Sequence, residues 1–310
     1  MPREKIRIGT RGSLLAIKQA EEVCQRLAAA HGLDAGLCEI CIIKTSGDRI
    51  QDRALKELGG KGLFTKEIEE SLISGEIDMA VHSMKDMPTV LPAGLAIAGV
   101  LPREDVRDAF VSLTAANLAS LPSGATLGTA SLRRQAQVKR SRPDLRVAMF
   151  RGNVQTRLRK LADGVADATL LAAAGLRRLG EAARITALMS PDDMLPAVAQ
   201  GAIGVEVRAD DTKMRVMLAA INDAETEVCL AAERAFLAAL DGSCRTPIAG
   251  LATLEGEQMR FRGEILLPDG SEHYATERRG SANRARAMGA DAADELRDRA
   301  GTAFFDALKA

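Results

Sequence analysis

The stretch KIRIGTRGSLLAIKQA, residues 5–20, predicts a strand, a short loop and a helix in that order. Apolar residues alternate as far as Thr10, which is typical of a β-strand. Apolar residues then recur at helical spacing, and their stripe comprises Ile17, Ala20, Cys24 and Leu27. Ser13 stands before the helix and is of a residue type that caps helix N-termini. The loop, Arg11-Gly12-Ser13, therefore carries polar side chains directly after a strand.

The same strand–loop pattern recurs along the first two thirds of the chain. The further predicted strands are Ile77–His82, Ala125–Gly128, Leu145–Phe150 and Ala168–Leu171. Strands that alternate with helices predict an α/β fold with a largely parallel, doubly wound sheet and helices on both faces. Ligands of such sheets bind beyond the carboxyl ends of the strands. We therefore expect the functional residues in the loops that follow the strands.

The pattern changes after about Asp223. A long helix is predicted over residues 225–240, alternating residues at 258–267 predict a short antiparallel sheet, and a closing helix is predicted over 283–308. A chain of 310 residues exceeds what one core usually holds, so two or three domains are expected. Residues 101–108 carry proline and charge and predict a hinge between the first two domains.

The amino-acid composition argues against several classes of binding partner. The 42 basic residues balance the 42 acidic ones, so bulk charge attracts no polyanion. There is no Trp and only 1 Tyr and 7 Phe, which argues against the stacking surfaces of single-strand nucleic-acid binders. No apolar run reaches the ~18 residues of a membrane span, and the first residues lack an apolar signal core. We expect a soluble cytosolic protein without nucleic-acid or membrane partners.

The loops after the strands carry one acid among many cations. Because these loops end on the same side of their sheets, their side chains are expected to converge: Arg11, Ser13, Lys85, Asp86, Thr129, Ser131, Arg133, Arg134, Arg151, Arg157 and Arg178. Arginine binds carboxylate or phosphate through a bidentate fork, so the predicted ligand is a multiply charged anion. The alternative is that these arginines lie on solvated helix faces. The binding interpretation is favoured for Arg11 and Arg151, which follow strands beside a glycine.

Two short motifs lack the spacing of the sites that they suggest. Gly59-Gly60-Lys61-Gly62 lacks the glycine spacing of a phosphate-binding loop. Residues 46–62 fit either a flexible loop that closes over a cleft or a surface turn. Cys38 and Cys41 lie at an odd offset in a predicted strand, residues 37–43, and so point to opposite faces. With only 3 histidines in the chain, no metal site is expected.

The remaining cysteines differ in setting. Cys24 and Cys229 fall in predicted helices and are expected to pack as apolar side chains. Cys244 follows Gly242 in LDGSCRTPI and lies in a constrained loop, where a nucleophile or attachment site competes with an inert thiol. Asp86 is the prominent carboxylate of the loops, and a structural salt bridge with Lys85 is its alternative role.

Several segments together resemble the porphobilinogen deaminase family in order and spacing, from about residue 6 to residue 251. The matching segments are GTRGSLLAIKQA from Gly9, KTSGD from Lys44, GGKGLFTKEIEESL from Gly59, IDMAVHSMKDMP from Ile77, LGTASLRRQAQ from Leu127, RGNVQTRLRKL from Arg151, LPAVAQGAIGVEVR from Leu195 and LDGSCRTPIAG from Leu240. VHSMKDMP, SLRRQ and the Cys244 loop are the most specific of these.

The resemblance implies two doubly wound lobes like those of periplasmic binding proteins and a smaller α+β C-terminal domain with a short antiparallel sheet. The implied domains are residues 1–101 with 202–219, residues 102–201, and residues 220–310. It also implies a cytoplasmic, monomeric transferase of haem biosynthesis. Such an enzyme joins four porphobilinogen molecules onto a dipyrromethane primer, with loss of ammonia, and releases hydroxymethylbilane.

The resemblance also implies roles for residues. Cys244 matches the cysteine that holds the dipyrromethane cofactor through a thioether, and Asp86 matches the catalytic aspartate that stabilises positive charge on pyrrole nitrogens. The positions that match binders of pyrrole acetate and propionate groups are Arg11, Lys85, Arg133, Arg134, Arg151, Arg157 and Arg178, assisted by Ser13, Ser83, Thr129 and Ser131.

Four positions depart from the usual family pattern: Leu14, Ala130, Ser243 and Arg245. None of the four is a reacting group, so these departures affect the expected geometry of the loops and not the expected activity. Two rival functions use the same arginines. A solute-binding module would bind a carboxylate ligand equally well but has no need of Cys244. A phosphate- or nucleic-acid-binding protein is disfavoured by the balanced charge and the few aromatic residues.

Overall fold

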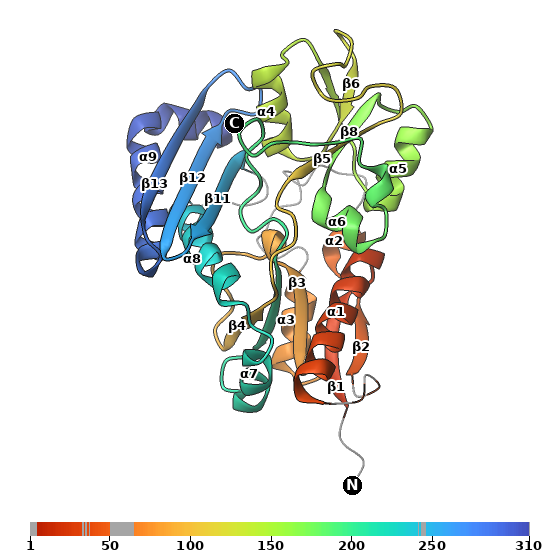
Figure 1. Ribbon diagram of the computed structural model, residues 1–310, viewed down its shortest axis with the longest axis vertical. Helices are drawn as coiled ribbons and strands as arrows, with labels where there is room; N and C mark the ends of the chain where they lie inside the picture. The colour runs from red at the N-terminus through yellow and green to blue at the C-terminus, as the bar shows by residue number, and fades with distance from the viewer. Residues whose placement is uncertain are drawn as a thin grey trace. The chain divides into compact units, whose positions relative to one another are not determined.

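The computed structural model in Figure 1 describes residues 5–32, 34, 36, 38–49, 65–240, 242 and 246–309. The described chain divides into two compact units. Unit 1 holds the described residues up to Glu104 together with Gly201–Glu227. Unit 2 holds Asp105–Gln200 and the described residues from Val228 onward. The chain therefore leaves unit 1 after Glu104 and returns to it at Gly201.

Unit 1 is built on a five-stranded sheet in the order β2-β1-β3-β10-β4. Its strands are β1 (Ile6–Arg11), β2 (Cys38–Ile43), β3 (Met79–Ser83), β4 (Leu95–Val100) and β10 (Ile203–Arg208). β1 pairs in parallel with β2 and β3, whereas β10 is antiparallel to β3 and β4. The one reversed strand is the one that follows the return of the chain.

Helices cover both faces of this sheet. They are α1 (Leu14–His31), α2 (Ser46–Arg49), α3 (Lys66–Ile73), the 3-10 helix η2 (Met84–Asp86) and α7 (Thr212–Ala219). On one face, Val23 of α1 and Leu218 of α7 share a buried core with Ile8. On the other, Ile68 of α3 packs in a core with Ala80. A fully buried aliphatic side chain contributes about 1.5–3 kcal/mol, so both faces stabilise the sheet.

Unit 2 contains a second five-stranded sheet, in the order β7-β6-β8-β5-β9. Its strands are β5 (Asp108–Ser112), β6 (Thr126–Gly128), β7 (Arg146–Ala148), β8 (Ala168–Ala172) and β9 (Ala187–Leu188). β6 is parallel to β7 and β8, and β5 is antiparallel to β8 and β9. Here too the reversed strand, β5, follows a crossing between the units.

Four helical segments accompany this sheet: α4 (Leu132–Ser141), α5 (Val154–Ala162), α6 (Ala173–Arg178) and the 3-10 helix η3 (Ala182–Arg184). Val138 of α4 packs in a core with Leu127 of the sheet. Leu161 of α5 and Leu176 of α6 pack in a separate core with Leu171. The helices of unit 2 therefore also cover both faces of the sheet.

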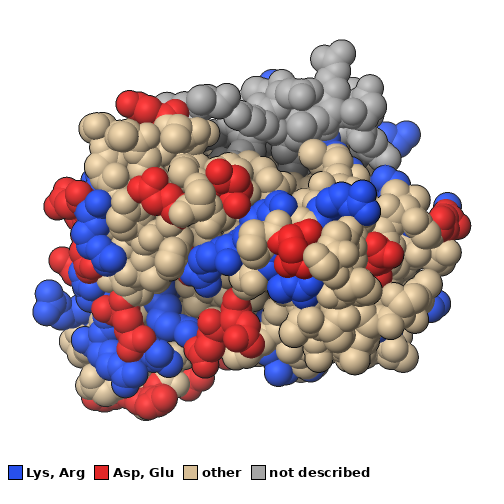
Figure 2. All heavy atoms as spheres, turned by 90° about the horizontal axis from the view of Figure 1, so that it is seen from above, with Lys and Arg blue, Asp and Glu red and all other residues tan. Residues whose placement is uncertain are grey.

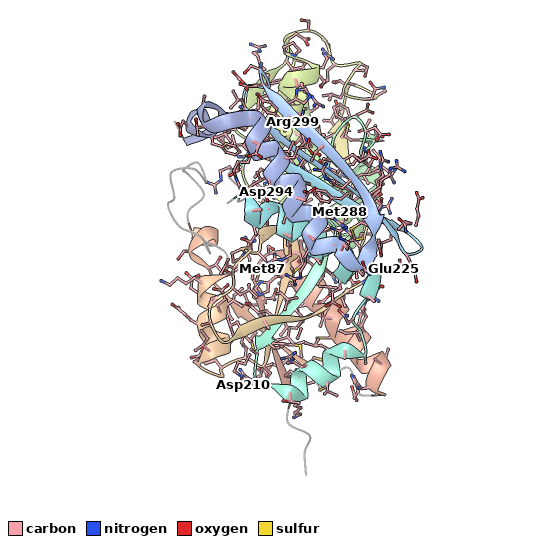
Figure 3. All side chains as sticks on the ribbon, turned by 90° about the vertical axis from the view of Figure 1, so that its left-hand side faces the viewer. Met87, Asp210, Glu225, Met288, Asp294 and Arg299 are labelled. Atoms are coloured by element: carbon pink, nitrogen blue, oxygen red, sulfur yellow. The ribbon has the colours of Figure 1, made fainter. Side chains whose placement is uncertain are left out.

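The C-terminal part of unit 2 is an antiparallel sheet with two long helices, the first of which begins within the last residues of unit 1. Its elements are α8 (Ala224–Ala239), β11 (Ile248–Glu255), β12 (Gln258–Leu266), β13 (His273–Ser281), the 3-10 helix η4 (Ala282–Arg284) and α9 (Ala285–Lys309). Figure 3 shows α9 running along the sheet, with Met288, Asp294 and Arg299 labelled on it. At Gly289 a Cβ would lie 2.0 Å from the carbonyl oxygen of Ala232, so glycine lets α8 and α9 pack closely.

The predicted fold class is confirmed: two α/β sheets covered by helices on both faces, and a smaller antiparallel C-terminal sheet. Ser13 caps α1 as expected, but the buried stripe of α1 includes Ala16 and Val23 while Ile17 is only half-buried. Cys38 and Cys41 pack against cores on opposite faces of the unit 1 sheet, as predicted. The three-domain division remains a proposal, and residues 50–62 of the expected loop at 46–62 lie outside the described residues.

Candidate functional site

In unit 1 the candidate residues gather at one edge of the sheet. Arg11 is the last residue of β1, and Ser83, Lys85 and Asp86 lie at the end of β3 and in the 3-10 helix after it. Because β1 and β3 are parallel neighbours, their carboxyl ends meet at the same edge. Asp86 is exposed there, and Lys85 and Arg11 are half-buried. The edge therefore presents one carboxylate beside two cations.

Two buried methionines anchor the segment that carries Asp86. Met84 and Met87 are 2% and 4% exposed and flank Lys85 and Asp86 (Met87 is labelled in Figure 3). The N–H of Met84 donates to the carbonyl oxygen of Ala202 at 3.0 Å. Because a buried methionine lies on each side of Lys85 and Asp86, packing of the methionines fixes the backbone that carries Asp86. The Asp86 carboxylate is not needed to hold this backbone in place.

Glycine on the neighbouring strand makes room for one of these methionines. A Cβ on Gly204 of β10 would lie 2.1 Å from Sδ of Met84. That distance is far below van der Waals contact, so any larger residue would displace the Met84 side chain. The chain at the start of β10 therefore supports the Asp86 segment in two ways: Ala202, just before the strand, accepts the backbone hydrogen bond, and Gly204 leaves space for Met84.

The two serines of unit 1 already have partners in the protein. Ser13 is the N-cap of α1, and its hydroxyl accepts a hydrogen bond from Ala16 N at 3.2 Å. The Ser83 hydroxyl lies 2.9 Å from the side-chain amide nitrogen of Gln19. Both contacts tie the site edge to the helix α1. The serines therefore hold the loop geometry in addition to any contact with a ligand.

A buried hydrogen-bonded pair next to this edge was not predicted from the sequence. Nε2 of His82 lies 3.0 Å from Oε2 of Glu206, and both side chains are almost fully buried. The two residues lie on β3 and β10, which are hydrogen-bonded neighbours. The signal available in the sequence was a charged residue inside each of two apolar strand segments, which indicates a buried pair.

In unit 2 the candidate residues also follow parallel strands. Thr129 and Ser131 follow β6, Arg151 and Arg157 follow β7, and Arg178 ends the helix after β8. β7, β6 and β8 are adjacent and parallel, so the loops that carry Thr129, Ser131 and Arg151 lie at the carboxyl edge of the sheet, whereas Arg178 lies six residues beyond the end of β8. Arg157 Nε donates to the carbonyl oxygen of Gly152 at 2.8 Å, which holds it against the loop after β7.

Thr129 and Ser131 organise the start of helix α4. Ser131 is its N-cap, and its hydroxyl accepts from Arg134 N at 3.4 Å. Thr129 is buried, and its hydroxyl accepts from Ser131 N at 3.1 Å. Helix N-termini carry partial positive charge, so this turn favours a nearby anion. The next two residues after Leu132 are the arginines that the sequence placed in the site.

Arg133 and Arg134, which we call the arginine pair, are buried against a protein carboxylate. Each is 5% exposed. Nη2 of Arg133 lies 2.7 Å from Oδ2 of Asp108, and Nε and Nη2 of Arg134 lie 3.0 and 2.7 Å from Oδ1. Asp108 was not among the site residues predicted from the sequence. A charged residue at the head of the apolar strand DAFVS was the signal that could have found it.

The charges in this cluster do not cancel. Asp108 is fully buried, and burial opposes its ionisation, but the two guanidinium groups outweigh burial and hold the pKa of Asp108 below its usual range. One carboxylate then faces two guanidiniums, which leaves an excess of positive charge. Nη1 of each arginine donates to a backbone carbonyl oxygen, of Leu195 and of Leu170. The pair is thus rigidly held and still attractive to an anion.

Cys244 lies outside the described residues, between Gly242 and Thr246. The described chain on both sides of it is well packed. A Cβ on Gly242 would lie 2.3 Å from Cδ1 of Ile248 and 2.6 Å from Cδ1 of Leu237. The N–H of Gly242 donates to the carbonyl oxygen of Leu237 at 3.0 Å. The ends of the cysteine loop are therefore attached to α8 and β11.

Charge elsewhere on the surface is mixed. On the face shown in Figure 2, described Lys and Arg side chains lie interspersed with Asp and Glu. Among the described residues, no group of three or more His, Cys, Asp or Glu side chains is arranged to hold a metal ion. None of the described helices is long and apolar enough to cross a membrane.

Comparison with known proteins identifies the family. The model described as porphobilinogen deaminase, dipyromethane cofactor binding domain, matches residues 6–216, and the model of the C-terminal domain matches residues 227–298. The chain belongs to the porphobilinogen deaminase family. The resemblance carried by the sequence motifs is thereby confirmed, and the match extends beyond residue 251, where the motifs had become diffuse.

Individual relatives are similar over nearly their full length. The porphobilinogen deaminase of Paracoccus denitrificans is 62% identical over 305 residues, which cover 98% of this chain and 97% of the relative. That of Nitrobacter hamburgensis is 59% identical, with 96% and 94% covered. Solved structures with a more distant similarity include the methionine-binding protein MetQ, with 12% identity, a TM-score of 0.45, and 72% of this chain and 92% of that chain covered. A periplasmic substrate-binding protein of an ABC transporter from Coxiella burnetii has 12% identity, a TM-score of 0.44, and 72% and 94% covered.

Proposed function

We propose that this chain is a hydroxymethylbilane synthase that joins four porphobilinogen molecules head to tail on a dipyrromethane primer. The observation that carries the proposal is the set of charged side chains that each of the two sheets carries at its own edge. In a chain of the porphobilinogen deaminase family, one exposed carboxylate, Asp86, stands beside cations at the edge of one sheet, and arginines line the edge of the other. Porphobilinogen carries two carboxylates and a pyrrole N–H, which these groups complement.

Asp86 is proposed to act electrostatically. When porphobilinogen loses ammonia, its C–N bond breaks and an azafulvene with positive character at the pyrrole nitrogen remains. The free α-carbon at the end of the growing chain then forms the new C–C bond with this azafulvene and afterwards loses its proton. A carboxylate that is already in place stabilises the developing charge on the pyrrole nitrogens. The burial of Met84 and Met87 on both sides of Asp86 supports such a fixed position.

The cations are proposed to bind the acetate and propionate groups of the pyrroles. Arg11 and Lys85 serve this role in unit 1. In unit 2 the binding groups are Arg133, Arg134, Arg151, Arg157 and Arg178, with Ser13, Ser83, Thr129 and Ser131 assisting at the respective edges. Charge-assisted hydrogen bonds contribute about 1.5–3 kcal/mol each. The positive excess at the arginine pair supports this assignment, because Asp108 neutralises only one of the two guanidiniums.

Cys244 is proposed to hold the dipyrromethane through a thioether. The group supplies, when bound, a free α-carbon at which elongation begins. The residues present fit it, because its acetate and propionate carboxylates match the cation-lined edges and the loop that carries Cys244 is attached at Gly242 and Ile248. We further propose that the protein acts in the cytoplasm as a monomer, and that it needs neither nucleic acid nor membrane.

The intact mass of purified protein tests the attachment. Wild type from cells that make porphobilinogen is expected to carry two linked pyrrole units, and Cys244→Ala is expected to carry none. Cys229→Ala is the matched control, since Cys229 is a buried thiol in α8 and its loss leaves Cys244 in place. Pyrrole mass on Cys244→Ala would overturn the choice of cysteine. Bare wild type that also takes up no mass from added porphobilinogen would return the solute-binding alternative to first place.

Asp86→Asn tests the catalytic role. The substitution keeps the size of the side chain and removes its charge, so we expect a folded protein that retains the pyrrole mass and has lost hydroxymethylbilane production. Asp210→Asn is the matched control, an exposed carboxylate in the same unit that precedes α7. Production near the wild-type rate by Asp86→Asn would refute the role.

A further inference from the structure

Gln200 is the last residue of unit 2 before the chain returns to unit 1. Its side chain is 1% exposed. It lies between two residues of positive φ, Ala199 at 62° and Gly201 at 90°. We call residues 199–201 the crossover segment. Left-handed backbone on both sides of Gln200 gives this segment a defined turn.

The side chain of Gln200 connects the returning chain to the outgoing chain. Its amide nitrogen donates to the carbonyl oxygen of Val106 at 2.8 Å and to Oδ1 of Asp108 at 3.1 Å. Val106 and Asp108 follow directly after the point where the chain leaves unit 1. The buried amide of Gln200 therefore holds the crossover segment against residues 106–108.

The same carboxylate, that of Asp108, also accepts hydrogen bonds from the arginine pair. Oδ1 of Asp108 accepts from Nε and Nη2 of Arg134, and Oδ2 accepts from Nη2 of Arg133. A continuous series of hydrogen bonds thus runs from Gln200 through Asp108 to both guanidinium groups. Any displacement of the crossover segment changes the position of the carboxylate to which the arginines are bound.

The neutral amide also preserves the charge of the cluster. Two guanidiniums and one carboxylate leave a net positive charge, and Gln200 completes the hydrogen bonding of Asp108 without cancelling that charge. A glutamate of the same size would place a second carboxylate beside the first. It would then compete with an anionic ligand for the arginines.

We propose that Gln200 is a positioning residue for substrate: through Asp108 it sets where the arginine pair presents its guanidiniums to a pyrrole carboxylate. This inference rests on the proposed function, in which the arginine pair binds the acetate or propionate groups. It adds that the crossover segment between the units is physically coupled to that binding. Gln200 does not touch the reacting atoms in this scheme.

The first test is kinetic and uses the cofactor-loaded protein, with loading verified by intact mass. Gln200→Met keeps the size and removes both hydrogen bonds. We expect the KM for porphobilinogen to rise about 10-fold with kcat nearly unchanged, as is usual when a supporting contact of a binding group is lost. Gln200→Glu is expected to raise KM further, because it neutralises the excess charge. Gln200→Asn, which shortens the side chain, carries the same expectation should Gln200→Met fail to fold.

The matched control is Gln135→Met. Gln135 lies on α4 next to the arginine pair, and its amide donates to the carbonyl oxygen of Pro268 at 3.1 Å. It has a similar hydrogen bond but lies outside the series that leads to Asp108. We expect its KM and kcat to match those of the wild type. A rise in KM equal to that of Gln200→Met would overturn the proposal, since any lost amide contact would then have the same effect.

A second readout does not depend on activity. The Nε–H resonance of Arg134, assigned by its loss in Arg134→Lys, reports the hydrogen bond to Asp108. We expect Gln200→Met to shift it and Gln135→Met to leave it in place. An unshifted resonance overturns the proposed route through Asp108, whatever KM does. A shifted resonance with unchanged KM overturns the proposed substrate role of the arginine pair and leaves the coupling itself supported.

Discussion

The carboxylate of Glu233 accepts a hydrogen bond of 2.6 Å from the backbone N–H of Ala199. Its other oxygen accepts from the N–H of Ala252 at 2.8 Å. Glu233 is fully buried on α8, so it joins this helix to β11 and to the crossover segment. Ala199 is, among the described residues, the non-glycine residue with positive φ. Its unusual conformation is held from outside by a buried carboxylate.

We expect Ala199→Gly to leave stability unchanged or to raise it by up to about 1 kcal/mol. A left-handed conformation costs an alanine roughly 1–2 kcal/mol, and relief of this strain offsets the greater backbone entropy that glycine loses on folding. Urea unfolding measures the change. Ala168→Gly, in a buried strand, is the control and should lose about 1 kcal/mol. If Ala199→Gly also lost about 1 kcal/mol of unfolding free energy, the backbone of Ala199 would not be strained.

Asp108→Asn should be strongly destabilising, by about 3–5 kcal/mol, because it leaves two buried guanidiniums without their carboxylate. The midpoint of urea unfolding at neutral pH measures this. Asp144→Asn removes an exposed carboxylate that pairs with Arg142, and its midpoint should stay close to that of the wild type. Equal shifts of the urea midpoint in the two variants would show that burial does not determine how much the Asp108 cluster contributes to the free energy of unfolding.

Gly204→Ala should impair turnover without touching substrate. The added methyl group would lie 2.1 Å from Sδ of Met84, so Met84 must move, and Asp86 lies two residues further along the same 3-10 helix. A displacement of this kind is expected to lower kcat by between about 10-fold and 100-fold. The double variant Gly204→Ala, Met84→Ala restores the space. Recovery of kcat in the double variant supports the steric route, and no recovery contradicts it.

Glu295→Gln should destabilise the C-terminal sheet in a pH-dependent way. A hydrogen bond from Thr276, and then the guanidiniums of Arg299 and Arg278, lower the pKa of Glu295 from 4.5 to about 2. A lowered carboxyl pKa stabilises the fold above the unfolded-state value, and this contribution is lost as the pH falls from about 4.5 towards about 2. At pH 7 we expect a loss of roughly 1 kcal/mol, reduced by solvent screening.

Unfolding in urea of wild type and Glu295→Gln at pH 7 and at about pH 3 checks this expectation. The difference between the two proteins should shrink at the lower pH, because the carboxyl group of Glu295 is then largely protonated in the unfolded chain and ionised mainly in the folded protein. A difference that is the same at both pH values would mean that the charge of Glu295 makes no contribution. Glu272→Gln is a suitable control, since Glu272 is exposed and its carboxylate accepts a hydrogen bond from the neutral Tyr274 hydroxyl.

Much of the fold followed from local sequence patterns. The alternation in residues 5–10 predicted β1, the helical spacing after Ser13 predicted α1, and Ser13 itself caps that helix. The loops after the strands carried the candidate residues of both sheet edges. These properties depend on neighbours within a few residues, because strand and helix periodicity and capping are local. The sequence by itself therefore determined the fold class, the family and the residue types of the site.

Only the tertiary structure decided how those residues are held. Asp108 meets Arg133 across 25 positions of the chain and Gln200 across 92, and His82 meets Glu206 across 124. No periodicity specifies such partners. The partners are determined by which strands become neighbours in each sheet and by which buried polar or charged groups must then be hydrogen-bonded. Residue types were thus set by the sequence, whereas the burial of the arginine pair and its connection to the crossover segment were set by the packing of distant segments.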